Sequence, residues 1–172
     1  HLSISLAGFE PNDYAMIMGF PGSTSRYLTG DEVKQRMFHE NEPRIAMRAV
    51  TLNIIREEMA KSEDIAIRYA NKQARISNYW KNSIGMNKAI VDNKVVETKL
   101  ANEAAFKAWA QQNGKSEYVD VVEKINACVE EANRTAYLTT LATELISCVE
   151  FVQRNLYHEA NMFNNPKLTQ DQ

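Results

Sequence analysis

The sequence predicts a mainly α fold, an antiparallel bundle of long helices preceded by a short pair of β-strands. Apolar residues recur at helical spacing, every three or four positions, through most of the chain after residue 43. Residues that cap or end helices divide this part into lengths typical of a bundle. The N-terminal residues alternate with period two around a turn, which indicates strands.

The N-terminal stretch carries the strand signal. Residues 1–6 alternate between polar and apolar side chains, and residues 10–13 (EPND) have turn chemistry. Residues 14–18 then form a short apolar run before a glycine-rich turn at residues 19–22. Two strands alone are marginal in water, so we expect this pair to belong to a larger sheet that the chain does not supply.

Helical signals begin after this turn. Thr29 and Glu32 fit a capping box, so a short helix is expected to start there. Pro43 suits the first turn of a second helix, because proline needs no hydrogen-bond partner at that position. The apolar positions of this second helix share one face: Ile45, Ala49, Leu52, Ile55 and Met59. Ser62 is placed to cap the next helix.

Residues 64–93 keep helical spacing and predict one long helix or two in line, because Gly85 can bend or interrupt the run. Residues 95–112 are rich in helix-forming residues and stop at Asn113-Gly114, a good helix terminator.

Two further helices are expected after Ser116, which can cap the first of them. The apolar positions of the first are Val119, Val122, Ile125, Val129 and Ala132. Those of the second are Leu138, Leu141, Leu145, Cys148, Val152 and Leu156.

Composition excludes several classes of protein. The net charge of -2 and the pI near 6.0 give no basic surface for nucleic acid. No segment approaches the roughly 18–20 consecutive apolar residues of a membrane span. Cys128 and Cys148 fall at apolar positions of helical patterns, which favours buried free thiols over a disulfide. No cofactor motif is present.

Histidine and serine patterns predict no catalytic or metal site. His1, His39 and His158 lie far apart, and no pair has the spacing of a helical metal site. No Gly-x-Ser-x-Gly stretch, which would hold an activated serine in a tight turn, occurs in the chain.

One polar helix face is distinctive. On a helix, Asn71, Asn78, Asn82 and Gly85 fall close to one line, with Arg75 adjacent. A carboxamide oxygen can accept a hydrogen bond from an ammonium group without neutralising it, which suits recognition of a free peptide N-terminus. The residues alone favour a plain solvated stripe over such a site.

Two motifs in order resemble a known family. They are residues 14–27 (YAMIMGFPGSTSRY) and, after the expected helix, residues 77–82 (SNYWKN). The pair resembles the bacterial dipeptidyl-peptidase 7 and dipeptidyl-peptidase 11 family over nearly the whole chain. These are serine exopeptidases that release dipeptides from free N-termini, with a chymotrypsin-like double β-barrel and an inserted helical domain.

The resemblance implies how the chain is divided. Residues 1–27 would be strands of the barrel and the turn that leaves it, residues 28–163 much of the helical domain, and residues 164–172 a polar tail. The catalytic histidine and aspartate would precede this stretch and the serine would follow it. The resemblance therefore implies that this part is inactive by itself and that His1 is not the catalytic histidine.

The resemblance also implies a binding role. The helical domain of the family closes over the cleft and contributes an asparagine that holds the ammonium group of the substrate. By its place in the second motif this is Asn78, with Asn82 as second choice. The implied partners are a peptide with a free N-terminus, the rest of the barrel and a second protomer, in the periplasm or at the cell surface.

An alternative reading is a stand-alone helical module whose apolar face binds a partner protein. Its weakness is the N-terminal strand pair, which has no sheet to join. Continuation of the reading frame past Gln172 into a glycine-flanked serine would separate the two readings.

Overall fold

The computed structural model describes residues 6, 8, 10–14, 16, 25–149, 151, 152, 154 and 155. This part is mainly helical, as predicted. Its elements are α1 (Gly30–Gln35), the π-helical segment η1 (Arg36–Asn41), α2 (Glu42–Met59), α3 (Glu63–Asp92), α4 (Val95–Gln112), the 3-10 turn η2 (Ser116–Tyr118) and α5 (Val121–Cys148).

The predicted strand pair is not confirmed. Most of residues 1–6 and 14–22 lie outside the described residues, and no described residue before Gly30 belongs to a strand. The turn between the predicted strands is present. The Asp13 amide donates to the Glu10 carbonyl at 3.1 Å, the Glu10 amide donates to Asp13 Oδ2 at 2.7 Å, and Asn12 has a φ of 77°.

The capping box at Thr29 is confirmed. The Glu32 amide donates to Thr29 Oγ1 at 3.2 Å, and the Thr29 amide donates to Glu32 Oε2 at 2.7 Å. Pro43 lies in the first turn of α2 as predicted, but α1, η1 and α2 run on as one rod without an intervening loop. The wider π turn, in which the Glu42 amide donates to the Met37 carbonyl, lets the rod continue although proline has no amide hydrogen.

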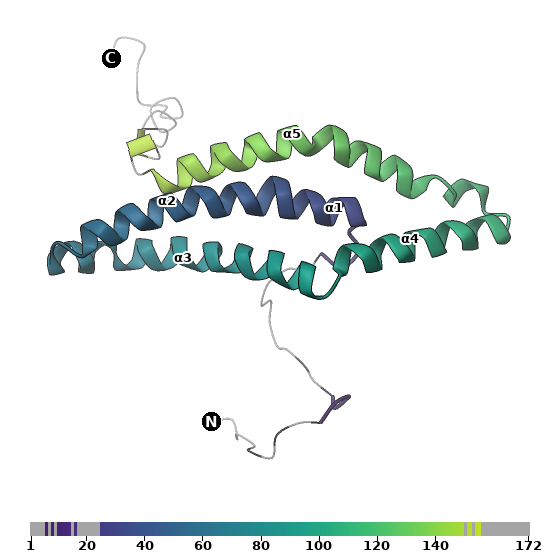
Figure 1. The fold of residues 1–172 in the computed structure, drawn as a ribbon, viewed down its shortest axis with the longest axis horizontal. Coiled ribbons are helices and arrows are strands. Elements are labelled where there is room, and N and C mark those ends of the chain that lie inside the picture. Colours follow the sequence, from purple (N-terminus) through teal and green to yellow (C-terminus); the bar gives the residue numbers. More distant parts are fainter. Residues whose placement is uncertain are drawn as a thin grey trace, which may run out of the picture.

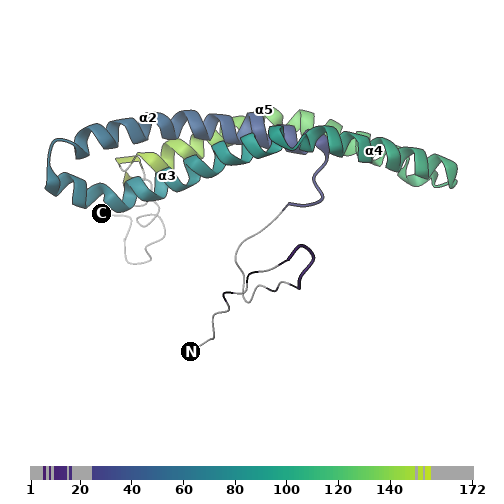
Figure 2. The same cartoon turned by 60° about the horizontal axis from the view of Figure 1, so that its bottom comes forward.

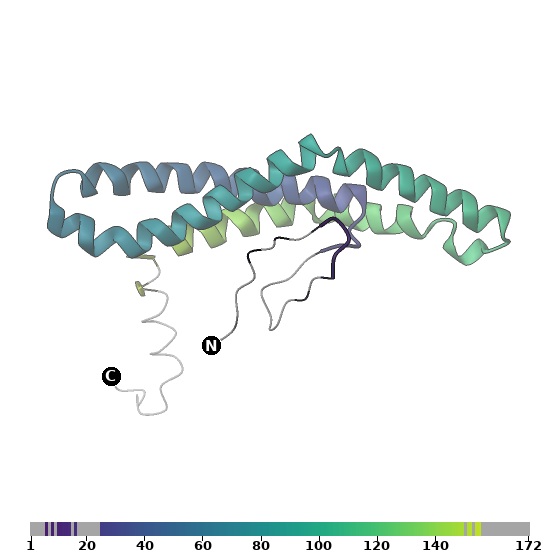
Figure 3. The same cartoon turned by 90° about the horizontal axis from the view of Figure 1, so that it is seen from below.

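The helices form an elongated antiparallel bundle (Figures 1 and 2). The rod of α1, η1 and α2 packs against α3 and α4 on one side and against α5 on another. Figure 3 shows α3 running back along α2 and α4 continuing beyond the start of α1 before α5 returns. No described helix is long and apolar enough to cross a bilayer.

The core lies between α2 and α3. Leu52 is completely buried and contacts Ile55 and Ile76, which are also buried. Side chains packed around these three are only partly covered: Met59, Tyr69 and Trp80. Ser62 stands at the N-cap of α3 as predicted, but its side chain makes no capping hydrogen bond.

The helix α3 passes through Gly85 without interruption. A methyl group added at this glycine would meet no atom within 4 Å. We therefore expect Gly85→Ala to raise the free energy of unfolding by roughly 1 kcal/mol, since glycine is that much less favourable than alanine inside a helix. Thermal unfolding followed by circular dichroism checks this, and an unchanged or lower Tm would contradict it.

The region after residue 116 differs from the prediction. The separation between Ala132 and Leu138 is wrong, because α5 runs unbroken from Val121 to Cys148 with no proline or glycine inside it. The helix α5 ends at Cys148, where Val149 is extended, and the described residues 151, 152, 154 and 155 beyond this break are again helical. Both cysteines are free, as favoured, but Cys128 is exposed and only Cys148 is buried.

Candidate functional site

The predicted asparagine face lies on α3 and points away from α2. Asn71, Asn78 and Asn82 are exposed, and Gly85 lies on the same side of the helix. The opposite side of α3 supplies Ile76 to the core. The carboxamides are therefore presented outward by a helix whose other side is fixed by packing.

The side chain of Arg48 fixes α3 relative to the other helices. Its Nε donates to Glu144 Oε2 at 2.7 Å, and its Nη2 donates to Glu144 Oε1 at 3.1 Å. Its Nη1 donates to the Ile76 carbonyl at 3.3 Å, and its guanidinium lies 5.2 Å from the centre of the Tyr79 ring. One side chain of α2 thus joins α3 to α5, two residues from Asn78.

Glu144 is the centre of this polar junction. Its side chain is 3% exposed and accepts hydrogen bonds from Arg48 and, at 3.1 Å, from Arg44 Nε. Two guanidinium groups around one carboxylate offset the cost of removing it from water. Burial and the neighbouring Glu144 raise the pKa of the Cys148 thiol, which keeps that thiol neutral at physiological pH.

A second polar contact ties η1 to α3. Asn41, which is 2% exposed, donates from Nδ2 to Asn87 Oδ1 at 2.7 Å. Asn87 Nδ2 in turn donates to the Met37 carbonyl at 3.4 Å. Buried carboxamides need such partners, so this pair fixes the position of the π segment along α3.

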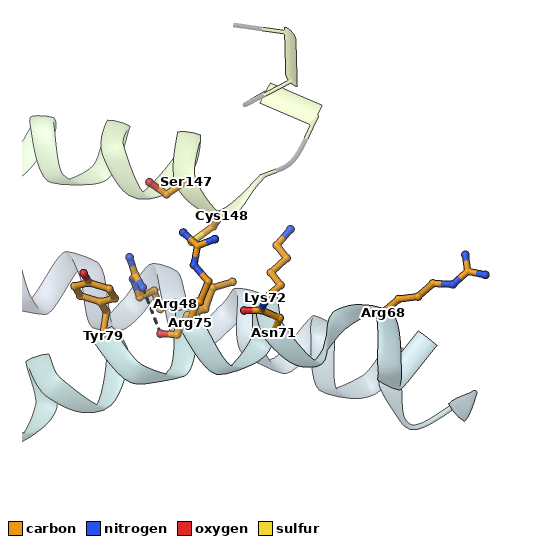
Figure 4. A pocket seen from close by; sticks show the side chains of 9 residues that line it. Arg48, Arg68, Asn71, Lys72, Arg75, Tyr79, Ser147 and Cys148 are labelled. Atoms are coloured by element: carbon orange, nitrogen blue, oxygen red, sulfur yellow. Dashed lines mark hydrogen bonds between the residues drawn. The ribbon is translucent and has the colours of Figure 1, made fainter. Parts of the chain in front are cut away.

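A pocket of about 480 Å³ lies beside the Glu144 junction, where the end of α5 meets α2 and α3 (Figure 4). Asn71 of the asparagine face takes part in its wall. The described residues that line the pocket are mostly basic or polar: Arg48, Arg68, Asn71, Lys72, Arg75, Ile76, Tyr79, Ser147 and Cys148.

The structure only partly unites the residues predicted from the sequence. Asn71 and Arg75 line this pocket, whereas Asn78 and Asn82 lie further along the exposed face. Sequence reasoning missed Arg48 and Glu144. A signal for Glu144 was present, because it lies three residues after Leu141 and four before Cys148, on the predicted buried stripe.

The described part of the chain contains no histidine in a metal-binding cluster. His39 packs edge-on against Tyr137, with ring centres 6.5 Å apart. His1 and His158 lie outside the described residues. Among the residues that are described, no three metal-binding side chains gather in one place.

Known proteins similar to this chain are peptidases. The peptidase S46 family profile matches residues 1–171. Dipeptidyl-peptidase 7 of Phocaeicola vulgatus is 56% identical over 145 residues, covering 84% of this chain and 20% of that protein. The Asp/Glu-specific dipeptidyl-peptidase of Porphyromonas gingivalis is 39% identical over 127 residues, covering 74% of this chain and 18% of that protein.

A solved structure agrees with the fold. The crystal structure of Porphyromonas endodontalis DPP11 in complex with the dipeptide Arg-Glu superposes with a TM-score of 0.68 at 32% identity, covering 73% of this chain and 18% of that one. The chain spans about one fifth of the length of the curated relatives it matches, 20% and 22% for the first two. The resemblance read from the two motifs is confirmed: the chain belongs to the peptidase S46 family.

Proposed function

We propose that this chain is a helical part of a serine exopeptidase that releases dipeptides from free N-termini, and that it covers the active-site cleft. The relatives over this region are named dipeptidyl-peptidases, and the related crystal structure holds a dipeptide. A rigid helical cover would exclude substrates with longer N-terminal extensions from the cleft. It would also hold the substrate in register with the catalytic residues.

The observation that carries the proposal is the rigid, outward presentation of Asn78. Its backbone lies between Ile76, whose carbonyl accepts from Arg48, and Trp80, which packs on the core. A fixed carboxamide oxygen can accept a hydrogen bond from the ammonium group of the substrate. Asn82, one turn further on the same face, is the second choice for this role.

The catalytic serine, histidine and aspartate belong to other parts of the peptidase in this proposal. The described residues form no such triad, and the chain by itself is expected to be inactive. The full peptidase would act in the periplasm or at the cell surface, as a homodimer, on peptides with a free amine.

The test is Asn78→Ala in the full-length peptidase. We expect the KM for dipeptidyl substrates to rise, and kcat/KM to fall, on the order of tenfold, because one hydrogen bond to a charged group is lost. Steady-state kinetics on a fluorogenic dipeptidyl substrate measure this.

Asn102→Ala serves as the matched control, because Asn102 is an exposed asparagine on α4, away from the asparagine face. Its kinetics should equal those of the unaltered enzyme. Equal kinetics for Asn78→Ala and Asn82→Ala as well would return the asparagine face to a plain solvated surface.

A further inference from the structure

The pocket between α2, α3 and the end of α5 collects positive charge in a chain whose net charge is -2. Four basic side chains line it, namely Arg48, Arg68, Lys72 and Arg75, and no acidic side chain does so among the described residues. We propose that this basic pocket binds carboxylate groups of acidic peptides.

The basic side chains of the pocket differ in whether they already form ion pairs. Glu144 holds Arg48 at 2.7 Å, and Asp64 holds Arg68 at 2.9 Å on the exposed surface. Arg75 has no hydrogen bond, ion pair or ring contact within the described part of the chain. In Figure 4 its guanidinium rises from α3 toward Ser147 and Cys148 at the end of α5. Arg75 is the group available to a ligand.

The chemistry of the basic pocket fits a carboxylate on a short apolar stem. A guanidinium group presents paired N–H donors that match the two oxygens of a carboxylate. The Arg48 guanidinium adds positive charge, because the single carboxylate of Glu144 is paired with Arg44 as well as with Arg48. Ile76 and Tyr79 supply an apolar wall for the methylene groups of an aspartate or glutamate side chain.

The basic pocket also continues the asparagine face, because Asn71 belongs to both. Arg75 and Arg68 precede Asn78 on α3 by about 5 Å and 15 Å along the axis, at about 1.5 Å per residue. An extended peptide covers about 3.3 Å per residue. A peptide that runs along α3 with its amine at Asn78 would therefore place roughly its second to fifth residues at the basic pocket. This register rests on the proposed function.

The binding test uses a peptide that cannot engage Asn78. An N-acetylated, fluorescently labelled peptide of alternating glycine and glutamate has carboxylates but no free amine, so its binding reports the pocket alone. Fluorescence anisotropy with the full-length peptidase should give a Kd that rises on the order of tenfold in Arg75→Gln, because a charge-assisted contact is lost. The Kd should be unchanged in Asn78→Ala.

Lys81→Gln is the matched control, because Lys81 is an exposed cation of α3 that does not line the basic pocket. Its Kd should equal that of the unaltered enzyme, and the glutamine analogue of the peptide should bind no variant. Equal Kd values for Arg75→Gln and the unaltered enzyme, or no binding to either, would overturn the proposal. Asn78→Ala kinetics separately decide the amine-binding role.

The kinetic arm tests the register. Substrates that share one N-terminal dipeptide but carry glutamate or glutamine at the third to fifth positions should differ in the unaltered enzyme, with lower KM for glutamate. Arg75→Gln should remove this difference through KM and leave the glutamine substrates unchanged. A difference that persists in Arg75→Gln would contradict the register.

Discussion

Replacing Glu144 with alanine should lower the free energy of unfolding by about 3–5 kcal/mol, because it leaves buried positive charge without a counter-ion. The carboxylate is 3% exposed and holds both Arg44 and Arg48, whose side chains are 27% and 11% exposed. Loss of the carboxylate also removes both ion pairs that join α5 to α2. Denaturant unfolding followed by circular dichroism in the full-length peptidase and in the chain measures this effect.

Two variants distinguish a lost ion pair from general damage to α5. Glu131→Ala removes an exposed acid of the same helix and should change the free energy of unfolding by less than about 0.5 kcal/mol. The double replacement Arg48→Met with Glu144→Leu should regain part of the loss, because it removes charge on both sides. A Glu144→Ala protein as stable as Glu131→Ala would show that the junction contributes nothing.

Leu52→Ala should have the second largest effect, a loss of about 2–5 kcal/mol, since it opens a cavity at a completely buried position. The removed methyl groups lie in the cluster with Ile55 and Ile76. The expected Tm is correspondingly lower. The same unfolding measurement checks it.

The neighbouring Ile54 provides the control, because it lies on the same helix but is 55% exposed. Ile54→Ala should cost less than about 1 kcal/mol, in proportion to the smaller apolar area that it buries. Similar losses for both variants would mean that the α2–α3 interface tolerates cavities and that the helices are held together elsewhere.

Local signals predicted the helices well. The capping box at Thr29, the apolar face around Leu52 and the terminator at Gly114, whose φ is 65°, depend on neighbours in sequence and are present. The continuity across Pro43 could not be predicted in this way. It depends on a π turn whose register is fixed by the Asn41 contact with Asn87 on another helix.

The candidate site was predicted only where it depends on neighbours in sequence. The exposed asparagine line follows from helix geometry, and Asn78 and Asn82 are exposed. The Arg48–Glu144 pair joins residues 96 apart in sequence, and no local pattern indicates which buried charge meets which. Most of residues 1–18 lie outside the described residues, so the strand pair stays a prediction that a structure of the full peptidase would test.

The π segment has the effect of one residue inserted into an α-helix. Successive side chains of an α-helix are rotated by about 100° around its axis. The extra residue therefore determines which side chains of α1 lie on the same side of the rod as the buried side chains of α2. It allows Val33 to be buried in α1 while Leu52 is buried in α2, although α1 packs against α4 and α2 packs against α3. A natural sequence one residue shorter here would present a rotated α1, and thus different side chains, to α4 and α5.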